Sequence, residues 1–242
     1  MAPEIVPTDA ELTIVWLSLR VALVALLLLI VPGIATGWLL ARGRFRGKAL
    51  LDVVVHLPLV LPPVVTGYLL LLLLGKQGLL GGWLAACGIR LAFTWQGAAL
   101  AAAVMAFPLL VRAVRLAIEL TDVRLEQAAA TLGASPWRVF TTITLPLAAP
   151  GILAGLVLSF ARCLGEFGAT ITFAGNLPGE TNTLPVAIWS ATQVPDGDGI
   201  ALRLVGLSLL LSLLALIGSE WLARWLARRQ GRAVESGAGS LT

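Results

Sequence analysis

The sequence predicts an all-α polytopic membrane protein with five transmembrane helices, and three observations lead to this fold class. Of the 242 residues, 58% are hydrophobic and only 12% are charged, whereas about a quarter of the residues in a soluble domain carry charge. The apolar residues come in long blocks, and the segments 57–75 and 91–111 contain no charged residue. A bilayer core of about 30 Å is crossed by about 20 helical residues, which matches these blocks. The basic residues, finally, gather in short clusters between the blocks.

The first two spans are expected at 13–40 and 51–75. Acidic residues precede the first block and basic residues follow it, which is the reverse of a cleaved signal peptide. We therefore expect the first block to be retained as a helix, with a kink at Pro32. Three prolines, at positions 58, 62 and 63, remove backbone donors from the second block, so its first half is expected to be bent or irregular.

Three further spans are expected at 93–114, 150–173 and 200–223. The alanine-rich third span has a small-residue face suited to close helix packing. The stretch 183–192 is too short to span and is predicted to be an external or re-entrant helix. A basic and then Gly/Ser-rich end predicts a disordered tail at about 230–242. No internal repeat is visible, so residues 1–242 are interpreted as a single transmembrane domain.

The basic clusters indicate how the chain is oriented. Twelve of the 17 Lys and Arg residues lie at 42–48, 112–138 and 224–232, which five spans place on one side of the membrane. The positive-inside rule makes that side the cytoplasm, with the N-terminus outside and the C-terminus inside. The net charge of +4 is thereby interpreted as a topology signal, and no nucleic-acid partner is expected. The polar segment 119–147, which we call the elbow, is placed in the cytoplasm.

Motifs for catalysis or metal binding are not found in the sequence. It contains no HExxH, G-x-S-x-G or CxxC, and the stretch 43–49 lacks the spacing of a phosphate loop. We therefore expect no enzymatic activity, no metal and no directly bound cofactor. Cys87 and Cys163 are expected at different levels of the membrane and unpaired. His56, the single histidine, is interpreted as a hydrogen-bonding residue in preference to a proton relay.

Arg162 and Glu166 are charged residues inside the fourth span. Their i, i+4 spacing puts them on one helical face, where opposite charges pair. A lone charge at mid-membrane costs roughly 2.5–3.5 kcal/mol on insertion scales, so such residues pair or face a cavity. Two readings stay open: a brace that holds the fourth span against its neighbours, or a gate beside a solute path.

The elbow interrupts the apolar pattern with two short helical segments. Residues 120–132 favour a helix, and Gly133 stands where a helix C-terminus favours glycine. Ser135 and Pro136 follow, as the N-cap and the first residue of a second helix. The two helices are expected to meet at an angle around the Gly133 break.

The second short helix carries Trp137 and Phe140 at i, i+3 spacing. An exposed aromatic pair fits a helix that docks into the groove of a partner protein. It fits equally well a helix that lies on the membrane surface with its aromatic rings among the lipid headgroups. Leu145-Pro146 is expected to turn the chain back toward the membrane.

The elbow also has a family-like spacing: Gln127-Ala128-Ala129, three residues, Gly133, nine residues, and Ile143-Thr144-Leu145-Pro146. It resembles the cytoplasmic loop of ABC-importer permeases, in which Glu-Ala-Ala begins the pattern. Gln127 stands here at the acidic position, with Glu126 just before it. Together with the stretches 56–71, 126–151 and 161–189, most of residues 14–226 resemble the molybdate, tungstate and sulfate permease family.

This resemblance implies the ABC type I importer permease fold, in the bacterial cytoplasmic (inner) membrane. It implies a permease subunit that forms the translocation path for an oxyanion, with molybdate favoured. The implied partners are a second copy of the chain in a homodimer, two cytoplasmic ATP-binding subunits that use the ATP, and an external or periplasmic oxyanion-binding protein. The alternatives are sulfate, tungstate, thiamine or iron as cargo, and, in a different class, an intramembrane enzyme or a stand-alone channel.

Two sets of residues are expected to carry this function. The resemblance assigns coupling to the ATPase subunit to residues of the elbow, namely Glu126, Gln127, Ala128, Ala129, Gly133, Ala134, Ser135, Trp137, Phe140, Leu145 and Pro146. Polarity and position in the spans suggest candidates for the path or its gate, namely Thr66, Ser159, Arg162, Glu166, Thr170 and Thr172.

Overall fold

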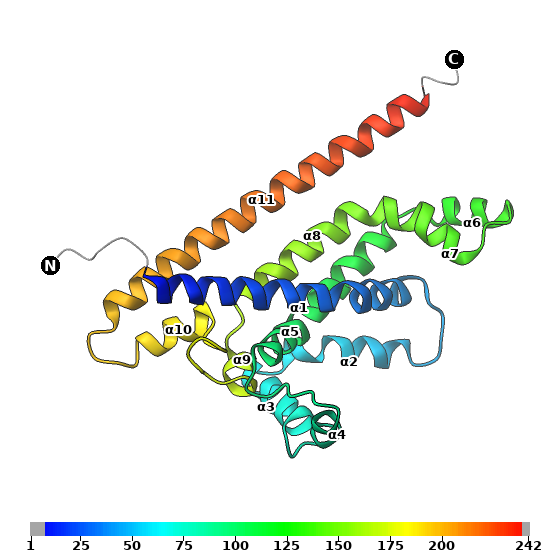
Figure 1. The fold of residues 1–242 in the computed structure, drawn as a ribbon. Coiled ribbons are helices and arrows are strands. Elements are labelled where there is room, and N and C mark those ends of the chain that lie inside the picture. Colours follow the sequence, from blue (N-terminus) through cyan, green and yellow to red (C-terminus); the bar gives the residue numbers. More distant parts are fainter. Residues whose placement is uncertain (1–7, 239–242) are drawn as a thin grey trace.

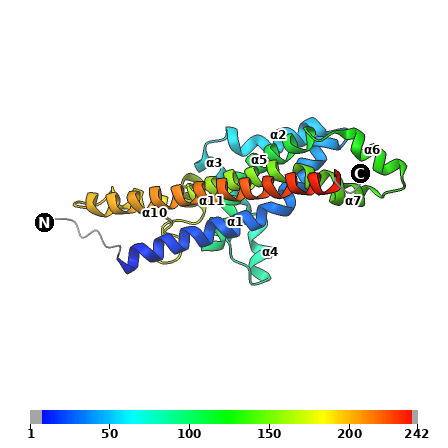
Figure 2. The ribbon, with the colours of Figure 1, turned by 90° about the horizontal axis from the view of Figure 1, so that it is seen from above.

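The computed structural model describes residues 8–238, with side chains described up to residue 218. Every regular element in this part of the chain is a helix, which confirms the all-α prediction. The long helices α1 (Asp9–Arg42), α5 (Trp95–Glu119) and α8 (Leu145–Leu164) pack against one another (Figure 1). Seen from above, α1 lies on one side of the line of α11 (Asp198–Ala238), and α2 and α3 lie on the other (Figure 2).

α1 is a continuous helix of 34 residues. Thr8 caps it by accepting a hydrogen bond from the backbone N–H of Glu11, whose carboxylate accepts one from the N–H of Thr8. Pro32 lies inside the helix and does not end it. At 1.5 Å per residue α1 is about 50 Å long, so it reaches from one end of the molecule to the other (Figure 1).

The second predicted span is broken into α2 (Lys48–Val60) and α3 (Pro63–Leu74), which meet at 115°. Its first half is a regular helix, so the expected irregular backbone is wrong there, even though Pro58 lies inside α2. The break falls at Leu61 and Pro62, whose backbone is extended. Two successive prolines, Pro62 and Pro63, explain this position, because a residue that precedes proline is disfavoured in the α region.

The contact between α1 and α5 forms the centre of the molecule. Small residues of α5 are buried in the same cluster as residues of α1: Ala98, Ala99, Ala102, Ala103 and Ala106. On α1, a Cβ atom added to Gly33 would lie 2.5 Å from Leu110 Cδ2, and one added to Gly37 would lie 2.6 Å from Val114 Cγ1. Helices in lipid gain stability from such close packing, since the lipid chains are themselves apolar. The predicted small-residue face of the third span is confirmed.

The elbow joins the fourth span differently from the prediction. α6 (Val123–Thr131) ends before Gly133, and α7 (Pro136–Val139) continues through a π-helical turn, η1 (Phe140–Thr144), directly into α8. The expected turn at Leu145-Pro146 is wrong, and the apolar helix begins at Pro136 instead of near residue 150. Proline is tolerated here because the π turn just before it widens the helix where the N–H of Pro146 is missing.

The remaining helices lie away from the elbow (Figure 1). α4 (Gly81–Ala86), which was not predicted, follows α3, and α9 (Gly168–Phe173) follows α8 after a short break. α10 (Leu184–Ala191) confirms the short helix expected at 183–192. It packs against α11 and is fixed to α1 by its first backbone N–H, which donates to Ser18 Oγ at 2.7 Å. The tail expected at about 230–242 overlaps the end of α11 and then lies outside the described residues, so its disorder stays a prediction.

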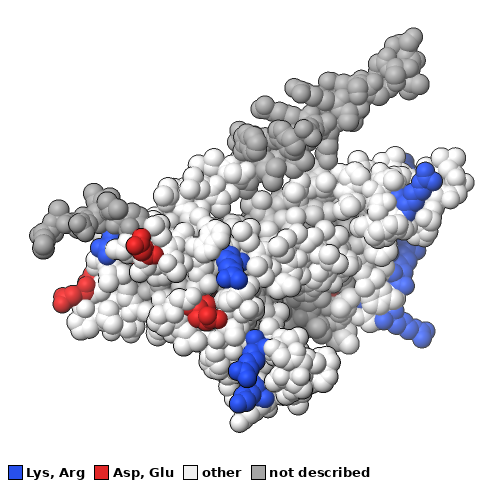
Figure 3. Space-filling view, in the orientation of Figure 1, with Lys and Arg blue, Asp and Glu red and all other residues white. Residues whose placement is uncertain are grey.

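Within residues 8–238, four helices are long and apolar enough to cross a bilayer, and the bent pair of α2 and α3 would supply a fifth crossing if it is one span. Most of the face shown in Figure 3 is uncharged, and only a few charged side chains lie away from the two ends. Lys and Arg gather at the end that carries the α1–α2 loop, α6 and α7, which we call the basic end. This pattern fits a protein that crosses a membrane several times.

The α1–α5 contact generates a stability prediction. Gly37→Val should lower the free energy of unfolding by about 1–3 kcal/mol, because its side chain would overlap Val114 in a tightly packed contact. Gly206→Val is the matched control, since nothing lies within 4 Å of a Cβ atom added there on α11. The measurement is the thermal unfolding midpoint of the detergent-solubilised protein, and equal midpoints for the two variants would contradict the prediction.

Candidate functional site at the basic end

The elbow forms the tip of the basic end (Figure 1). Its reversal of direction depends on Gly133, whose φ of +85° lies in the left-handed region that glycine adopts without strain. The N–H of Ala134 donates to the carbonyl oxygen of Ala129 at 3.1 Å, which closes the end of α6. Ser135 then caps α7 by accepting a hydrogen bond from the N–H of Arg138. The predicted Gly133 break and Ser135 cap are confirmed.

Glu126 points inward and joins the elbow to the rest of the molecule. Its Oε1 atom accepts hydrogen bonds from Arg42 Nη2 at 3.0 Å and from Thr144 Oγ1 at 2.9 Å. Arg42 Nη2 also donates to the carbonyl oxygen of Thr121 at 3.0 Å, just past the end of α5. Both charged side chains are largely removed from solvent, with 19% of Arg42 and 16% of Glu126 exposed. We call this arrangement the Glu126 clamp, and it connects α1, the end of α5, α6 and η1.

At the start of the motif, Glu126 makes the internal contacts among the described residues and its neighbour at position 127 does not. Gln127, at the position that is acidic in the family pattern, is exposed, whereas Glu126 is partly buried. Glu126 is among the predicted coupling residues, whereas Arg42 was predicted only as part of a basic cluster. Arg42 and Glu126 are 84 residues apart, and no local spacing signals their contact.

Trp137 of α7 and Phe140 of η1 face α1. The rings of Trp137 and Phe140 have centroids 5.7 Å apart, and Phe140 makes an edge-on contact with Trp38 of α1 at 5.8 Å. A groove of about 590 Å³ lies between the two helices, with an almost wholly apolar lining: Ile30, Val31, Ile34, Ala35, Trp38, Pro136, Trp137, Phe140 and Leu145. Since Ile30 to Trp38 belong to a membrane-crossing helix, this geometry favours the membrane-surface reading for the aromatic rings.

A separate part of the elbow is open to solvent. Leu132, at the tip of the turn after α6, is 89% exposed, and Leu125 is 48% exposed. Gln127, Ala128 and Ser135 are exposed as well, on α6 and at the start of α7. Large apolar side chains left in solvent beside a tight turn are typical of a surface that a partner covers.

The polar candidates for a solute path are mostly buried between helices of the single chain. Ser159 is fully buried and its hydroxyl donates to the carbonyl oxygen of Gly155 at 2.7 Å. Thr170 is 1% exposed, and Thr172 donates to the carbonyl oxygen of Gly168. Thr66 is 5% exposed, and its hydroxyl has no hydrogen-bond partner among the described residues. These side chains therefore face neighbouring helices within this chain.

Arg162 and Glu166 form the ion pair that their spacing suggested. The Glu166 side chain is almost completely buried, and its second oxygen accepts a hydrogen bond from the N–H of Ala169 at 2.9 Å. Glu166 therefore holds the end of α8 to the start of α9. Arg162 keeps 31% of its side chain exposed. This geometry favours the brace reading for Glu166, while Arg162 still borders an open surface.

Glycines allow α3 to approach the short helix α9 closely. A Cβ atom added to Gly67 would lie 2.6 Å from the carbonyl oxygen of Ala169, and one added to Gly168 would lie 2.7 Å from Pro63 Cβ. The brace at Glu166 thus positions α9 against the broken second span. Gly67 is not among the predicted residues, because a lone glycine in an apolar helix does not by itself indicate a close approach.

Comparison with known proteins identifies the family. Residues 33–229 match the family described as binding-protein-dependent transport system inner membrane component. The chain is 58% identical over 229 residues to the molybdenum transport system permease protein ModB of Escherichia coli (strain K12), covering 93% of this chain and 99% of the relative. It is 53% identical over 223 residues to the ModB protein of Haemophilus influenzae, covering 92% and 97% of the two chains.

A more distant relative and two solved structures are also similar. The sulfate transport system permease protein CysT of Escherichia coli is 40% identical over 182 residues, covering 74% of this chain and 66% of that one. A chain of the MetNI methionine ABC transporter aligns with a TM-score of 0.70 at 17% identity, over 91% of this chain and 99% of that one. A chain of a bacterial ABC transporter for the import of alginate aligns with a TM-score of 0.73 at 19% identity, over 90% and 80%.

The family match covers most of the chain, and the two structural alignments show the same fold in importers of other cargoes. The apolar helices described above agree with a protein that crosses the membrane several times. The chain therefore belongs to the family of inner membrane components of binding-protein-dependent transport systems.

Proposed function

We propose that this chain is the permease subunit of an ABC importer that moves molybdate across the bacterial inner membrane. Molybdate is proposed as the cargo because the chain is highly identical, over nearly its full length, to two proteins named molybdenum transport system permease. Residues 1–242 act as one permease domain without catalytic activity or a cofactor of their own. Tungstate and sulfate are the alternative cargoes, and the sulfate permease named above supports the second.

In the proposed orientation, the basic end lies in the cytoplasm. The basic clusters of the α1–α2 loop and the elbow sit at that end, as the positive-inside rule requires. The N-terminus then lies outside and the C-terminus inside. The segment 175–183 and α10 lie at the opposite end, where an external oxyanion-binding protein would approach.

The proposed assembly contains two copies of this chain, two ATP-binding subunits on the elbows and the external binding protein. The exposed residues around the α6–α7 turn, above all Leu132, supply the surface for the ATPase. ATP is bound and hydrolysed by that partner, and it must favour one state of the transporter to shift the equilibrium between inward-open and outward-open forms.

The Glu126 clamp connects the elbow to the membrane-spanning helix α1. A movement of α6 carries Glu126, and through it Arg42 at the end of α1. At its other end, α1 is tied to α11 by Glu11, whose Oε1 accepts from Arg203 Nε at 2.8 Å, and to α10 by Ser18. Movement at the elbow therefore reaches the outer end of the molecule through a single helix.

The cargo is tested by the ATPase activity of the reconstituted transporter with its cognate binding protein. Molybdate-loaded binding protein should raise ATP hydrolysis and drive uptake into vesicles, and sulfate should do so only weakly. Stronger stimulation by sulfate or tungstate would replace molybdate as the cargo. Uptake without any ATPase subunit would contradict the importer and favour a stand-alone channel.

Docking of the ATPase is tested at the α6–α7 turn. Gly133→Asp should abolish co-purification of the ATPase subunit, because it puts a negative charge into the turn where the two helices meet. Gly133→Asn is the matched control: asparagine and aspartate both adopt the left-handed conformation, so the uncharged variant should keep most of the complex. Trp137→Ala separates the two aromatic readings, since its complex should persist if the ring rests on the membrane side. An intact complex for Gly133→Asp would contradict the docking surface.

Coupling is tested at the Glu126 clamp. Hydrogen bonds to charged groups contribute about 1.5–3 kcal/mol, so Glu126→Ala and Arg42→Ala should each lower the molybdate imported per ATP hydrolysed by about tenfold. Arg42→Glu combined with Glu126→Arg should restore part of that ratio. Arg44→Ala, an exposed residue of the same basic cluster, is the control and should leave it unchanged. An unaltered ratio in the single variants would mean that the clamp does not transmit movement.

A further inference from the structure

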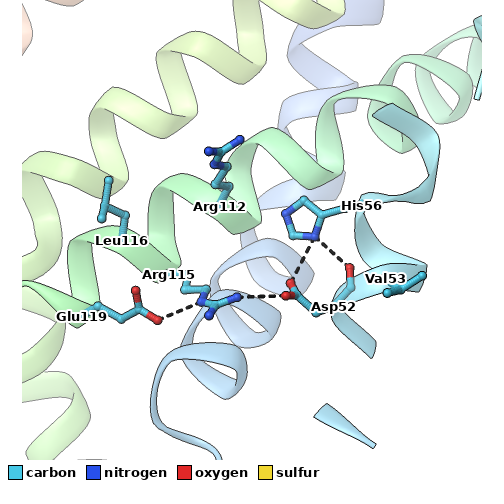
Figure 4. A pocket seen from close by; sticks show the side chains of 7 residues that line it. All are labelled: Asp52, Val53, His56, Arg112, Arg115, Leu116 and Glu119. Atoms are coloured by element: carbon cyan, nitrogen blue, oxygen red, sulfur yellow. Dashed lines mark hydrogen bonds and ion pairs between the residues drawn. The ribbon is translucent and has the colours of Figure 1, made fainter. Parts of the chain in front are cut away.

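A cleft with several charged side chains in its wall opens between α2 and α5 near the basic end (Figure 4). Its volume is about 470 Å³, and seven residues line it: Asp52, Val53, His56, Arg112, Arg115, Leu116 and Glu119. Neither Arg112 nor His56 belongs to the elbow or to the expected solute path. The cleft is a concave site with charged groups that the functions described so far leave unexplained.

The two carboxylates of the cleft are occupied by one arginine. Arg115 Nη1 lies 3.1 Å from Asp52 Oδ2, and Arg115 Nε lies 2.8 Å from Glu119 Oε1. Because a guanidinium offers several donors in a fixed plane, Arg115 can hold both acids at once. Their negative charge is thereby partly compensated within the cleft wall, and Arg115 is committed to them.

Arg112 is left without a direct partner among the residues of the cleft. No hydrogen bond or ion pair joins it to the other residues of the cleft, and Figure 4 shows its guanidinium standing apart from the Asp52–Arg115–Glu119 network. His56 Nδ1 donates to the carbonyl oxygen of Asp52 at 2.8 Å, so its other ring nitrogen, Nε2, remains available. In Figure 4 that nitrogen is on the side of the ring that faces Arg112.

Arg112 lies well inside its membrane-spanning helix, where a charged side chain without a partner needs an explanation. Gly33 of α1 contacts Leu110 of α5 and Gly37 contacts Val114, so Arg112 lies level with about residue 35 of α1. That is seven residues before Arg42, or about 10 Å inward from the end of α1. His56 is eight residues into α2, or about 12 Å from its start at the same end. A charged side chain at this depth in lipid is unfavourable unless it pairs or faces water.

We propose that this cleft is a binding site for a tetrahedral oxyanion on the inner half of the translocation path, with Arg112 as its main ligand. The proposal rests on the proposed function, and it places the anion after it has crossed the centre of the membrane. The guanidinium of Arg112 donates to two oxygens of the anion, as arginine does with phosphate. His56 Nε2 lies at the side of the site and donates to the anion when the ring is protonated.

The residues that line the cleft suit weak and reversible binding of the anion. Arg112 is the single uncommitted positive side chain of the seven, and Val53 and Leu116 add no hydrogen-bond donors. A transport path needs sites that attract the ion but hold it weakly enough to let it leave. A phospholipid headgroup carries the same phosphate chemistry and could occupy the cleft from the membrane side, so the experiment includes an arm for it.

The test measures equilibrium binding of radiolabelled molybdate to the purified permease–ATPase complex, without binding protein or nucleotide. The wild-type complex should bind the anion, and sulfate should compete. Arg112→Gln should weaken binding about tenfold or more, the effect expected from losing a charge-assisted contact. Arg112→Lys should keep part of it. Arg46→Gln, the same change at an exposed position of the α1–α2 loop, is the matched control and should bind like the wild type.

A second variant protects the test against misfolding of Arg112→Gln. Leu116 is 56% exposed and lines the cleft, so Leu116→Glu should fold and repel the dianion, again weakening binding about tenfold. Equal binding by the wild type, Arg112→Gln and Leu116→Glu would overturn the proposal. So would molybdate binding that appears only after anionic phospholipid is removed, since the cleft would then belong to a lipid headgroup.

Transport separates this proposal from the function on which it rests. If the wild-type transporter imports molybdate with its binding protein but its complex binds no anion alone, the site is wrong and the function stands. If the wild type imports sulfate and its complex binds sulfate through Arg112, the cargo is wrong and the site stands. A wild type that imports no oxyanion contradicts the proposed function, whereas binding that depends on Arg112 would still support the site.

Discussion

The close contact between α1 and α5 is the constraint from which the other positions follow. Gly33 and Gly37 let the two backbones approach where any larger residue would overlap Leu110 or Val114. α5 is thereby enclosed on one side by α1, and it also packs against α8, α2 and α9. Because α5 is fixed along most of its length, its end at Glu119 gives the elbow a firm origin. The Glu126 clamp then fastens the elbow to α1, the same helix that anchors α5.

The sequence predicts the fold well wherever a local pattern is sufficient. The apolar blocks indicated α1, α5 and α11, the prolines indicated a disturbed second span, and Gly133 with Ser135 indicated the α6–α7 turn. The continuous passage from α7 to α8 was missed, because Leu145-Pro146 looks like a helix start. A π turn, which has no sequence signal comparable to a cap, accommodates the proline instead.

The functional residues were predicted less completely, for a physical reason. Hydroxyl groups inside a helix can donate to their own backbone, as Ser159 and Thr172 do, so a polar residue in a span need not face a solute. The contacts that connect the elbow to the other helices join residues far apart in the sequence, such as Arg42 and Glu126. Arg112 was counted as a topology signal, and its position in a cleft became visible only with α2 packed beside α5. Charge in a membrane protein can serve orientation and chemistry at once.

The uninterrupted helix from Pro136 to Leu164 has a mechanical consequence. Near its middle, Gly151 and Gly155 rest against Ala117 and Ala113 of α5, where an added Cβ atom would lie 2.6 Å and 2.5 Å from the alanine side chains. This tight contact acts as a pivot, with α7 at one end of the helix and Glu166 just beyond the other. A sideways displacement of α7 rotates the helix about this contact and moves its Glu166 end in the opposite direction. A force applied to α7, outside the membrane on one side, would therefore displace the Glu166 brace, and with it α9, in the opposite direction.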